Sequence, residues 1–381
     1  VAVPPRCVDK PLILYGAGNL GRMAKDYLNH VGIPFRYVID ANPAAFRDDP
    51  AWKGIHVVGP ERVSEADKNT SLLAVCISTV PYVPIYQSLV AQGWEHVVPF
   101  YDITESYRDR HPLSNGWFAG RLDETDIAGI ERVLERWGDD ESRAHHIQFV
   151  AWRCLREEWT FDGAIPVIGD RYFIPEVRSF LNERESFLDV GAHHGEVSIK
   201  FSEIMDGMFK EITVIEPDGT NLSILRKNLD VYFQGALSPK IRIVDSVIGD
   251  RVGDGRFYDG LDYAAQLCAI GPQSMTVRTI DEMSIAPTFI KLHLEGAEFA
   301  AIRGGEATIR TGRPLIAATA YHSRLGLWKF PLWLMDNLVN YRFLLRLHGW
   351  CGTALVVYAI PQERMLPSLS HITINRNGVF T

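Results

Sequence analysis

The chain has no long hydrophobic run. Its 381 residues contain no apolar stretch approaching the roughly 18 residues that a membrane helix needs. No basic region followed by an apolar core opens the sequence, so the pattern of a secretory signal is missing too. We therefore expect no membrane span and a cytoplasmic location.

Cysteine is scarce and scattered. The chain has five cysteines, and no two of them stand at C-x-x-C spacing. The odd number and the wide scatter argue against a disulfide framework and against a zinc cage. We expect small buried side chains and no metal site, and a reducing compartment is again consistent with cytoplasm. The cysteines are Cys7, Cys76, Cys154, Cys268 and Cys351.

Basic residues are not in excess. Lysine and arginine number 39 against 47 aspartates and glutamates, which leaves a formal net charge of −8. The surplus of acid lies within residues 101–186 rather than around the glycine-rich stretches described below. Nucleic-acid-binding proteins carry a basic footprint, so the charge pattern excludes DNA and RNA as expected partners.

What the sequence does contain is a strand, a glycine-rich turn and a helix in the middle of the chain. The apolar run 186–188 ends in Asp189, and Gly191 and Gly195 follow before helical periodicity begins. A second apolar run, 212–215, ends in an acidic residue, Glu216. Such an acid can accept hydrogen bonds from ribose hydroxyls, while the loop lacks the tight pyrophosphate turn. The pattern predicts a nucleoside-bearing cofactor.

Two motifs in this half resemble a known family. Residues 187–198 resemble the cofactor loop of class I S-adenosylmethionine-dependent methyltransferases. Residues 289–298, FIKLHLEGAE, resemble the signature of the FkbM methyltransferase family, which usually reads I-K-x-D-x-E-G-x-E. The chain departs from that signature because His293 stands where the family has aspartate. The resemblance covers residues 171–361 and implies S-adenosylmethionine as methyl donor.

The donor-binding residues expected from these motifs lie at the tips of three strands. Those of the glycine turn and the second strand carry the resemblance, and the last two follow the third strand, where they can flank the adenine. They are Asp189, Gly191, Ala192, Gly195, Glu216, Asp245 and Ser246.

Methylation of a hydroxyl requires a group that removes its proton. The expected catalytic residues are His293, Glu295 and His322, at or near the ends of the fourth and fifth strands, and Glu298 is a further candidate. Three interpretations of His293 stay open: the base, a neutral hydrogen-bonding group beside the donor, or part of a degraded site. The adjacent pair His193–His194 is expected to form loop hydrogen bonds rather than a metal site.

The first hundred residues carry a second glycine motif. Strand 11–15 runs into G-x-G-x-x-G, and strand 35–39 ends in an acid. The region resembles the nucleotide-sugar-binding domain of PglD-type sugar acyltransferases. A dinucleotide site, a nucleotide-sugar site and a module without ligand remain alternatives. The residues of such a site are Gly16, Gly18, Asn19, Leu20, Gly21 and Asp40.

The expected fold class is α/β, with two doubly wound Rossmann-like domains joined by a helical segment. A chain of this length exceeds what one core usually fills. We place the small Rossmann-like domain at 1–105, the helical linker at 106–170 and a methyltransferase domain of class I fold at 171–381. Helices are predicted at 123–137 and 141–159, with their charges in solvent.

The function that these patterns favour is an S-adenosylmethionine-dependent methyltransferase acting on a hydroxyl of a sugar or another small acceptor. A nicotinamide-dependent oxidoreductase is the first alternative, although no second mononucleotide half follows the motif at 16–21. A non-catalytic nucleotide-sugar-binding protein is the second. The partner expected is a small molecule or carbohydrate, and a homo-oligomer stays open.

Overall fold

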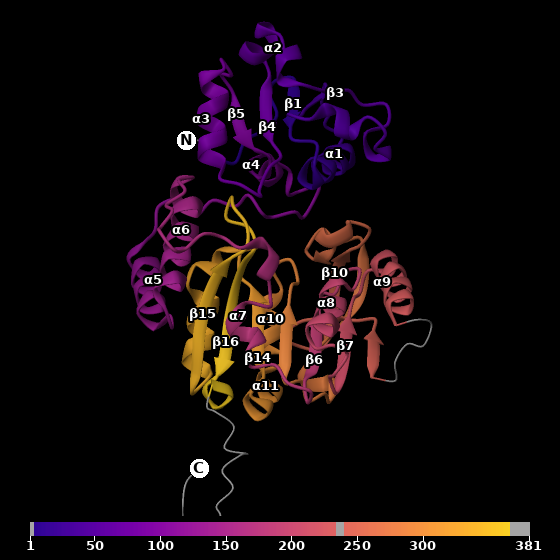
Figure 1. The fold of residues 1–381 in the computed structure, drawn as a ribbon, viewed down its shortest axis with the longest axis vertical. Coiled ribbons are helices and arrows are strands. Elements are labelled where there is room, and N and C mark those ends of the chain that lie inside the picture. Colours follow the sequence, from indigo (N-terminus) through magenta and orange to yellow (C-terminus); the bar gives the residue numbers. More distant parts are fainter. Residues whose placement is uncertain (1–3, 234–239, 366–381) are drawn as a thin grey trace, which may run out of the picture.

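The computed structural model describes residues 4–233 and 240–365. Within these residues the chain forms three sheets, and the two larger ones lie one above the other in Figure 1. Alternation of apolar strands with helices predicts doubly wound sheets, and this α/β architecture is confirmed for both.

The first sheet is wholly parallel, in the order β3-β2-β1-β4-β5. Its central strands β1 and β4 are almost entirely apolar because helices cover both faces of a parallel sheet. The strands are β1 (Leu12–Tyr15), β2 (Val38–Ile39), β3 (Val57–Val58), β4 (Leu72–Val75) and β5 (Val97–Pro99). The helices are α1 (Asn19–Val31), α2 (Glu65–Thr70), α3 (Tyr82–Ala91) and α4 (Phe100–Thr104).

Two helices follow, close to the predicted positions: α5 (Glu124–Arg136) and α6 (Asp140–Leu155). The side chains of Asp123 and Asp139 cap their N-termini, which explains where each helix begins. The prediction that their charges face solvent is wrong for the end of this segment. Arg153 and Arg156 are fully buried, because α6 packs against the last hairpin of the chain.

The large sheet has the order β15-β16-β14-β13-β6-β7-β8. Strands β6, β7, β8, β13 and β14 are parallel, and β16 runs antiparallel to both of its neighbours. The strands are β6 (Ser186–Val190), β7 (Glu211–Ile215), β8 (Ile241–Val244), β13 (Phe289–Leu292), β14 (Leu315–Thr319), β15 (Tyr341–Leu347) and β16 (Leu355–Pro361). The helices are α7 (Pro175–Arg178), α8 (Glu196–Ile204), α9 (Gly219–Tyr232), α10 (Glu298–Arg303), α11 (Glu306–Gly312) and α12 (Lys329–Asn337).

After β8 the chain forms a small sheet, which the sequence pattern does not predict. Residues 275–280 have the pattern of an edge strand, and most of them lie in β12, which pairs within the order β11-β10-β12-β9. Its strands are β9 (Val247–Ile248), β10 (Gly253–Tyr258), β11 (Gln266–Leu267) and β12 (Gln273–Arg278). The short 3₁₀ turn η6 (Asp262–Ala264) joins β10 to β11.

The two large sheets are joined through the loop between β15 and β16. The Trp350 amide donates to the Ser78 carbonyl at 3.1 Å, and Trp350 and Cys351 pack in one apolar cluster with Ile13 and Leu73 of the first sheet. The carboxyl edge of the large sheet therefore faces the first domain (Figure 1). Among residues 4–233 and 240–365, no helix has the length and apolarity to cross a membrane.

Candidate active site

The glycine turn after β6 is held tightly between two neighbouring strands. The amides of Gly191 and Ala192 both donate to the Ile215 carbonyl at the end of β7, at 3.0 and 3.1 Å. Gly191 has φ +72°, and a Cβ atom there would lie 1.9 Å from the His293 carbonyl oxygen at the end of β13. A side chain at Gly191 is therefore sterically excluded. Gly195, at φ +89°, precedes α8.

Asp189 lies beneath this turn rather than at an open surface. Its carboxylate accepts hydrogen bonds from Lys291 Nζ and Ser198 Oγ, each at 2.8 Å, and it is fully buried. Lys291 also donates to the Gly191 carbonyl at 2.6 Å. The pair thus holds the turn from below. Lys291 is not among the site residues predicted from the sequence, although it is part of the I-K motif.

A cleft of about 600 Å³, including its open mouth, lies above the turn. Of the seven residues predicted to bind the donor, Gly191, Glu216 and Ser246 line it. Ala192 lines a neighbouring cavity, and Asp245 is exposed and does not line the cleft. The small sheet supplies much of the opposite wall, through Phe257, Gln266 and Leu267.

Glu216 is the acid at the tip of β7, as the sequence predicts. It is 5% exposed, and its two carboxylate oxygens accept from the amides of His193 at 2.8 Å and Asp218 at 3.0 Å. A carboxylate has about four acceptor positions, so two remain for a ligand. Burial raises the pKa of Glu216, and the two amide hydrogen bonds oppose that effect.

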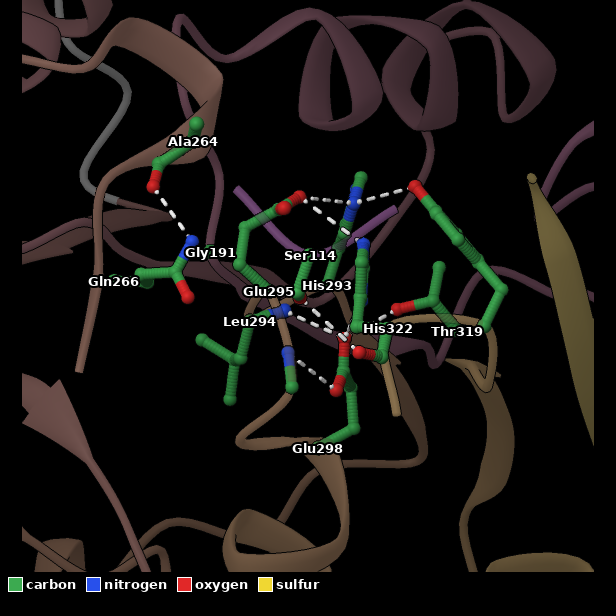
Figure 2. A network of polar contacts seen from close by, with 12 residues as sticks. Ser114, Gly191, Ala264, Gln266, His293, Leu294, Glu295, Glu298, Thr319 and His322 are labelled. Atoms are coloured by element: carbon green, nitrogen blue, oxygen red, sulfur yellow. Dashed lines mark hydrogen bonds and ion pairs between the residues drawn. The ribbon is translucent and has the colours of Figure 1, made fainter. Parts of the chain in front are cut away.

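The three predicted catalytic residues meet at the ends of β13 and β14. Figure 2 shows contacts from the Glu295 carboxylate to both imidazole rings. Glu295 Oε1 lies 3.0 Å from His293 Nε2 and 3.2 Å from His322 Nε2. The Nδ1 atoms are held as well: His322 Nδ1 lies 2.9 Å from Glu298 Oε1, and His293 Nδ1 lies 3.0 Å from the Tyr172 hydroxyl.

The two histidines have opposite electrostatic surroundings. Burial and the nearby Arg171 lower the pKa of His293 to about 4, so its ring is neutral at neutral pH. Burial alone would lower the pKa of His322, but Glu295 and Glu298 raise it well above its ordinary value. The two carboxylates therefore favour the charged form of His322, whereas the surroundings of His293 favour its neutral form.

Other polar groups complete this network. Thr319 Oγ1 donates to Glu298 Oε1 at 2.6 Å, and the Tyr321 hydroxyl lies 3.2 Å from His293 Nε2. Ser114, from the segment before α5, donates to the His322 carbonyl at 3.1 Å. Tyr172 and Ser114 carry no sequence signal for this role, because they come from segments outside the motif.

In the first domain, the acidic residue predicted to hold a ribose already accepts hydrogen bonds from the chain's own backbone. Asp40 accepts from the amides of Ala17 at 2.9 Å and Asn42 at 2.8 Å. At Gly21 a Cβ atom would lie 2.1 Å from the Gly16 carbonyl oxygen, so a residue without a side chain is needed where α1 packs against the turn after β1. Asn19 lines a cavity of about 1330 Å³, including its mouth, between α1 and η6. A ligand for Gly16, Gly18, Leu20 and Asp40 stays a prediction.

Acidic side chains lie close to the two adjacent histidines of the glycine turn. His193 Nε2 lies 2.6 Å from Asp262 Oδ1, and the His193 and His194 rings stack with centroids 3.6 Å apart. The expected loop hydrogen bonding is therefore present, and it joins the turn to η6. Burial lowers the pKa of His193, but Asp262 and Glu196 outweigh it and raise the pKa to about 9.

Comparison with solved structures identifies a protein with the same overall arrangement. No protein-family model and no curated protein matches the chain. The methyltransferase FkbM from Methylobacillus flagellatus KT matches with a TM-score of 0.63 and 18% identity, over 93% of this chain and 91% of that one.

Other methyltransferase structures match part of the chain. Precorrin-6y C5,15-methyltransferase from Geobacter metallireducens GS-15 has a TM-score of 0.31 and 14% identity, over 52% of this chain and 95% of its own. The N-terminal domain of human METTL16 in complex with SAH has a TM-score of 0.31 and 11% identity, over 61% of this chain and 92% of its own. TM-scores this low do not indicate a shared overall fold. By the first match, the chain has the fold of the FkbM methyltransferase structure, as its motifs predict.

Proposed function

We propose that the chain is an S-adenosylmethionine-dependent methyltransferase that acts on a hydroxyl of a sugar or another small acceptor. The observation that carries the proposal is the cleft at the carboxyl edge of the large sheet. There Gly191 provides bare backbone and Glu216 a buried acid, on the tips of adjacent parallel strands. Ligands of open α/β sheets bind at this edge.

The lining of the cleft fits an adenosyl group. Residue 191 carries no side chain, because the His293 carbonyl takes the place of a Cβ atom, so the turn presents bare backbone to the cleft, and Glu216 has acceptor positions left for ribose hydroxyls. Apolar side chains that suit a purine face the same space, and polar ones stand beside them to bond the purine edge. The apolar residues are Ile215, Ile248, Phe257, Leu267 and Leu294, and the polar ones are Ser246, Asn221 and Gln266.

When bound, S-adenosylmethionine supplies an electrophilic methyl group on a sulfonium. The task left to the chain is to align an acceptor hydroxyl and to move its proton. His293 and Glu295 line the cleft, so they are the candidates for contacting the acceptor hydroxyl. A histidine with a pKa of about 4 accepts a hydrogen bond at neutral pH but is a weak base. We therefore do not assign the role of general base to His293.

The proposal of a carbohydrate acceptor rests on the cavity below α1. Asp262 and Tyr263 line both this cavity and the donor cleft. An acceptor held by the first domain would therefore reach the cleft past η6. The resemblance of the first domain to nucleotide-sugar-binding domains supports a sugar in this position.

Calorimetric titration with S-adenosylmethionine tests the donor site. We expect Glu216→Gln to weaken binding at least tenfold and Asp245→Asn to leave it unchanged. The two variants remove the same charge on neighbouring strands, but only the first lies in the cleft. Asp189 is unsuitable because its removal would leave Lys291 buried without its carboxylate. Absence of binding by the unaltered chain would refute the proposal.

A further inference from the structure

The cluster of His293, Glu295 and His322 has the geometry of a metal-binding site. One ligand atom from each lies within 4.8 Å of the other two. Both Nε2 atoms approach the same carboxylate oxygen, at 3.0 and 3.2 Å. Ligands about 2.0–2.2 Å from a metal lie roughly 3 Å apart when they are neighbours in its coordination shell. The distances from Glu295 to each of the two histidines are therefore already those of neighbouring ligands in such a shell.

The groups behind the cluster hold the rings as metal-bound histidines are held. A histidine that binds a metal through one nitrogen usually donates its other N–H to a carboxylate or a carbonyl. His322 Nδ1 has Glu298 as this partner, at 2.9 Å. Glu298 in turn accepts from the amides of Leu294 at 3.1 Å and Gly296 at 2.9 Å. The Nε2 atom of His322 is thereby directed at Glu295.

Two atoms of the cluster lack hydrogen bonds to any described residue. They are Glu295 Oε2 and His322 Nε2, on residues that are only 6% and 3% exposed. Although Glu295 Oε1 lies close to His322 Nε2, their geometry is not that of a hydrogen bond. Unpaired buried polar atoms are costly and rare, so each needs an explanation. A cation held by His322 Nε2 and by both oxygens of Glu295 would give both atoms a partner.

We infer that His293, Glu295 and His322 bind a divalent transition-metal ion. Two imidazoles and one carboxylate suit zinc, iron, cobalt or manganese, whereas magnesium and calcium prefer a set made of oxygen atoms. Three protein ligands leave coordination positions open. Because His293 and Glu295 line the cleft, these positions face its interior.

The part that the metal plays in methylation rests on the proposed function. An oxygen of the acceptor hydroxyl would occupy an open position, where a divalent metal lowers the pKa of a bound hydroxyl. The proton would then pass to solvent. A separate side-chain base would then not be needed, since the metal performs the activation.

Cobalt(II) is the probe for the test, because its visible absorption reports nitrogen and oxygen ligands directly. The full-length chain, freed of metal with a chelator, is titrated with Co²⁺ by calorimetry and by absorption. We expect one tight site per chain. Binding should weaken at least 100-fold in His322→Gln and about 10- to 100-fold in Glu298→Gln, which removes only the supporting carboxylate.

Two control variants separate this site from others. His56→Gln removes an exposed histidine outside both clusters, and His194→Gln disrupts the second group of possible ligands, His193, His194 and Asp262. Both should keep the tight site. Circular dichroism checks the fold of each variant, and Glu295→Gln replaces His322→Gln if the latter does not fold. Lack of tight binding, or binding lost in His194→Gln but kept in His322→Gln, would overturn the inference.

These titrations contain no methyl donor, so their outcome is independent of the proposed function. With an acceptor in hand, chelation should abolish turnover while leaving donor binding intact. Turnover that survives complete removal of metal would refute the role assigned to the metal in methylation, but a binding site found with Co²⁺ would stand.

Discussion

At the scale of single residues, the site depends on a turn that has no room for a side chain at residue 191. Gly191 lies against the end of β13, and Lys291 ties its carbonyl to the buried Asp189. Motif reasoning identifies Gly191 and Asp189 as donor contacts. In the structure Asp189 has a supporting position instead, because it is fully buried beneath the turn and does not line the cleft.

The first prediction concerns Gly191→Ala. We expect this substitution to lower the free energy of unfolding by roughly 1–3 kcal/mol, because residue 191 has positive φ and its Cβ would meet the His293 carbonyl. Donor binding should weaken at least tenfold. Thermal unfolding and calorimetry measure the two effects.

The matched control is Gly253→Ala. A Cβ at residue 253 meets nothing within 4 Å, and its backbone does not have positive φ. Stability should therefore change by less than about 0.5 kcal/mol. Equal losses from both variants would show that close approach at residue 191 is not the cause.

At the scale of elements, α6 is fastened to β15 through its N-terminal cap. Asp139 accepts from the Ser142 amide at 2.8 Å and from Arg346 at 2.8 Å, so one carboxylate both starts the helix and binds the strand. Burial raises the pKa of Asp139, but hydrogen bonds from Arg346 and Ser142 outweigh it and lower the pKa to about 2. This contact makes the helix–hairpin interface sensitive to acid.

We predict that Asp139→Asn destabilises the protein by on the order of 2 kcal/mol at pH 7. The folded-state pKa lies below the ordinary value of 3.8, so the stabilisation is present above about pH 4 and disappears as pH falls through 2. The difference between the two proteins should shrink to roughly half by pH 3. Urea unfolding at pH 7, 5 and 3 measures it.

Asp140→Asn serves as the neighbouring control. The Asp140 side chain is fully exposed and, among the described residues, its ion pair is with Arg143 in its own helix, so its loss should leave stability almost unchanged. A difference for Asp139→Asn that does not vary with pH would contradict the assignment of its stabilising effect to charge.

At the scale of the whole molecule, one buried side chain joins the helical segment to the site. The Arg153 guanidinium donates to the carbonyls of Asn115 at 2.8 Å, Trp117 at 3.0 Å, Tyr321 at 3.1 Å and Gly352 at 2.7 Å. These carbonyls belong to the segment before α5, to the end of β14 and to the last hairpin loop. The planar fork of donors is what spans them.

We therefore expect Arg153→Lys to be almost as harmful as Arg153→Met, each lowering the free energy of unfolding by roughly 3 kcal/mol or more. A lysine ammonium cannot reach four divergent carbonyls. Equilibrium unfolding in urea provides the comparison, with Arg132→Met as a surface control, since Arg132 is largely exposed and pairs with Asp336 at 3.5 Å. Near-normal stability of Arg153→Lys would show that positive charge alone suffices there.

Most strands of the two large sheets could be anticipated from the sequence, while the small sheet could not. Strands such as Leu72–Val75 and Phe289–Leu292 are short apolar runs next to turn residues, which is a local signal. The segment Gly253–Tyr258 is mostly polar and contains two glycines, so it has no such signal. It becomes a strand because Gln273–Arg278 and Gln266–Leu267 pair with it.

The metal-capable cluster was likewise beyond motif reasoning. His293, Glu295 and His322 were each selected, but as separate acid–base candidates, and no metal site was expected. Their side chains converge because β13 and β14 are neighbours in parallel register. Register is a property of the assembled sheet, which residue spacing does not report.

The sequence by itself determined the alternation of strands and helices, the glycines of the two turns and the acid at the tip of β7, because periodicity and backbone sterics act over a few neighbouring residues. Only the tertiary structure decided that Asp189 is buried against Lys291, that Arg153 crosses between segments, and that two histidines share one glutamate. Those features depend on which distant segments become neighbours, and burial then sets the charge and the partners of each group.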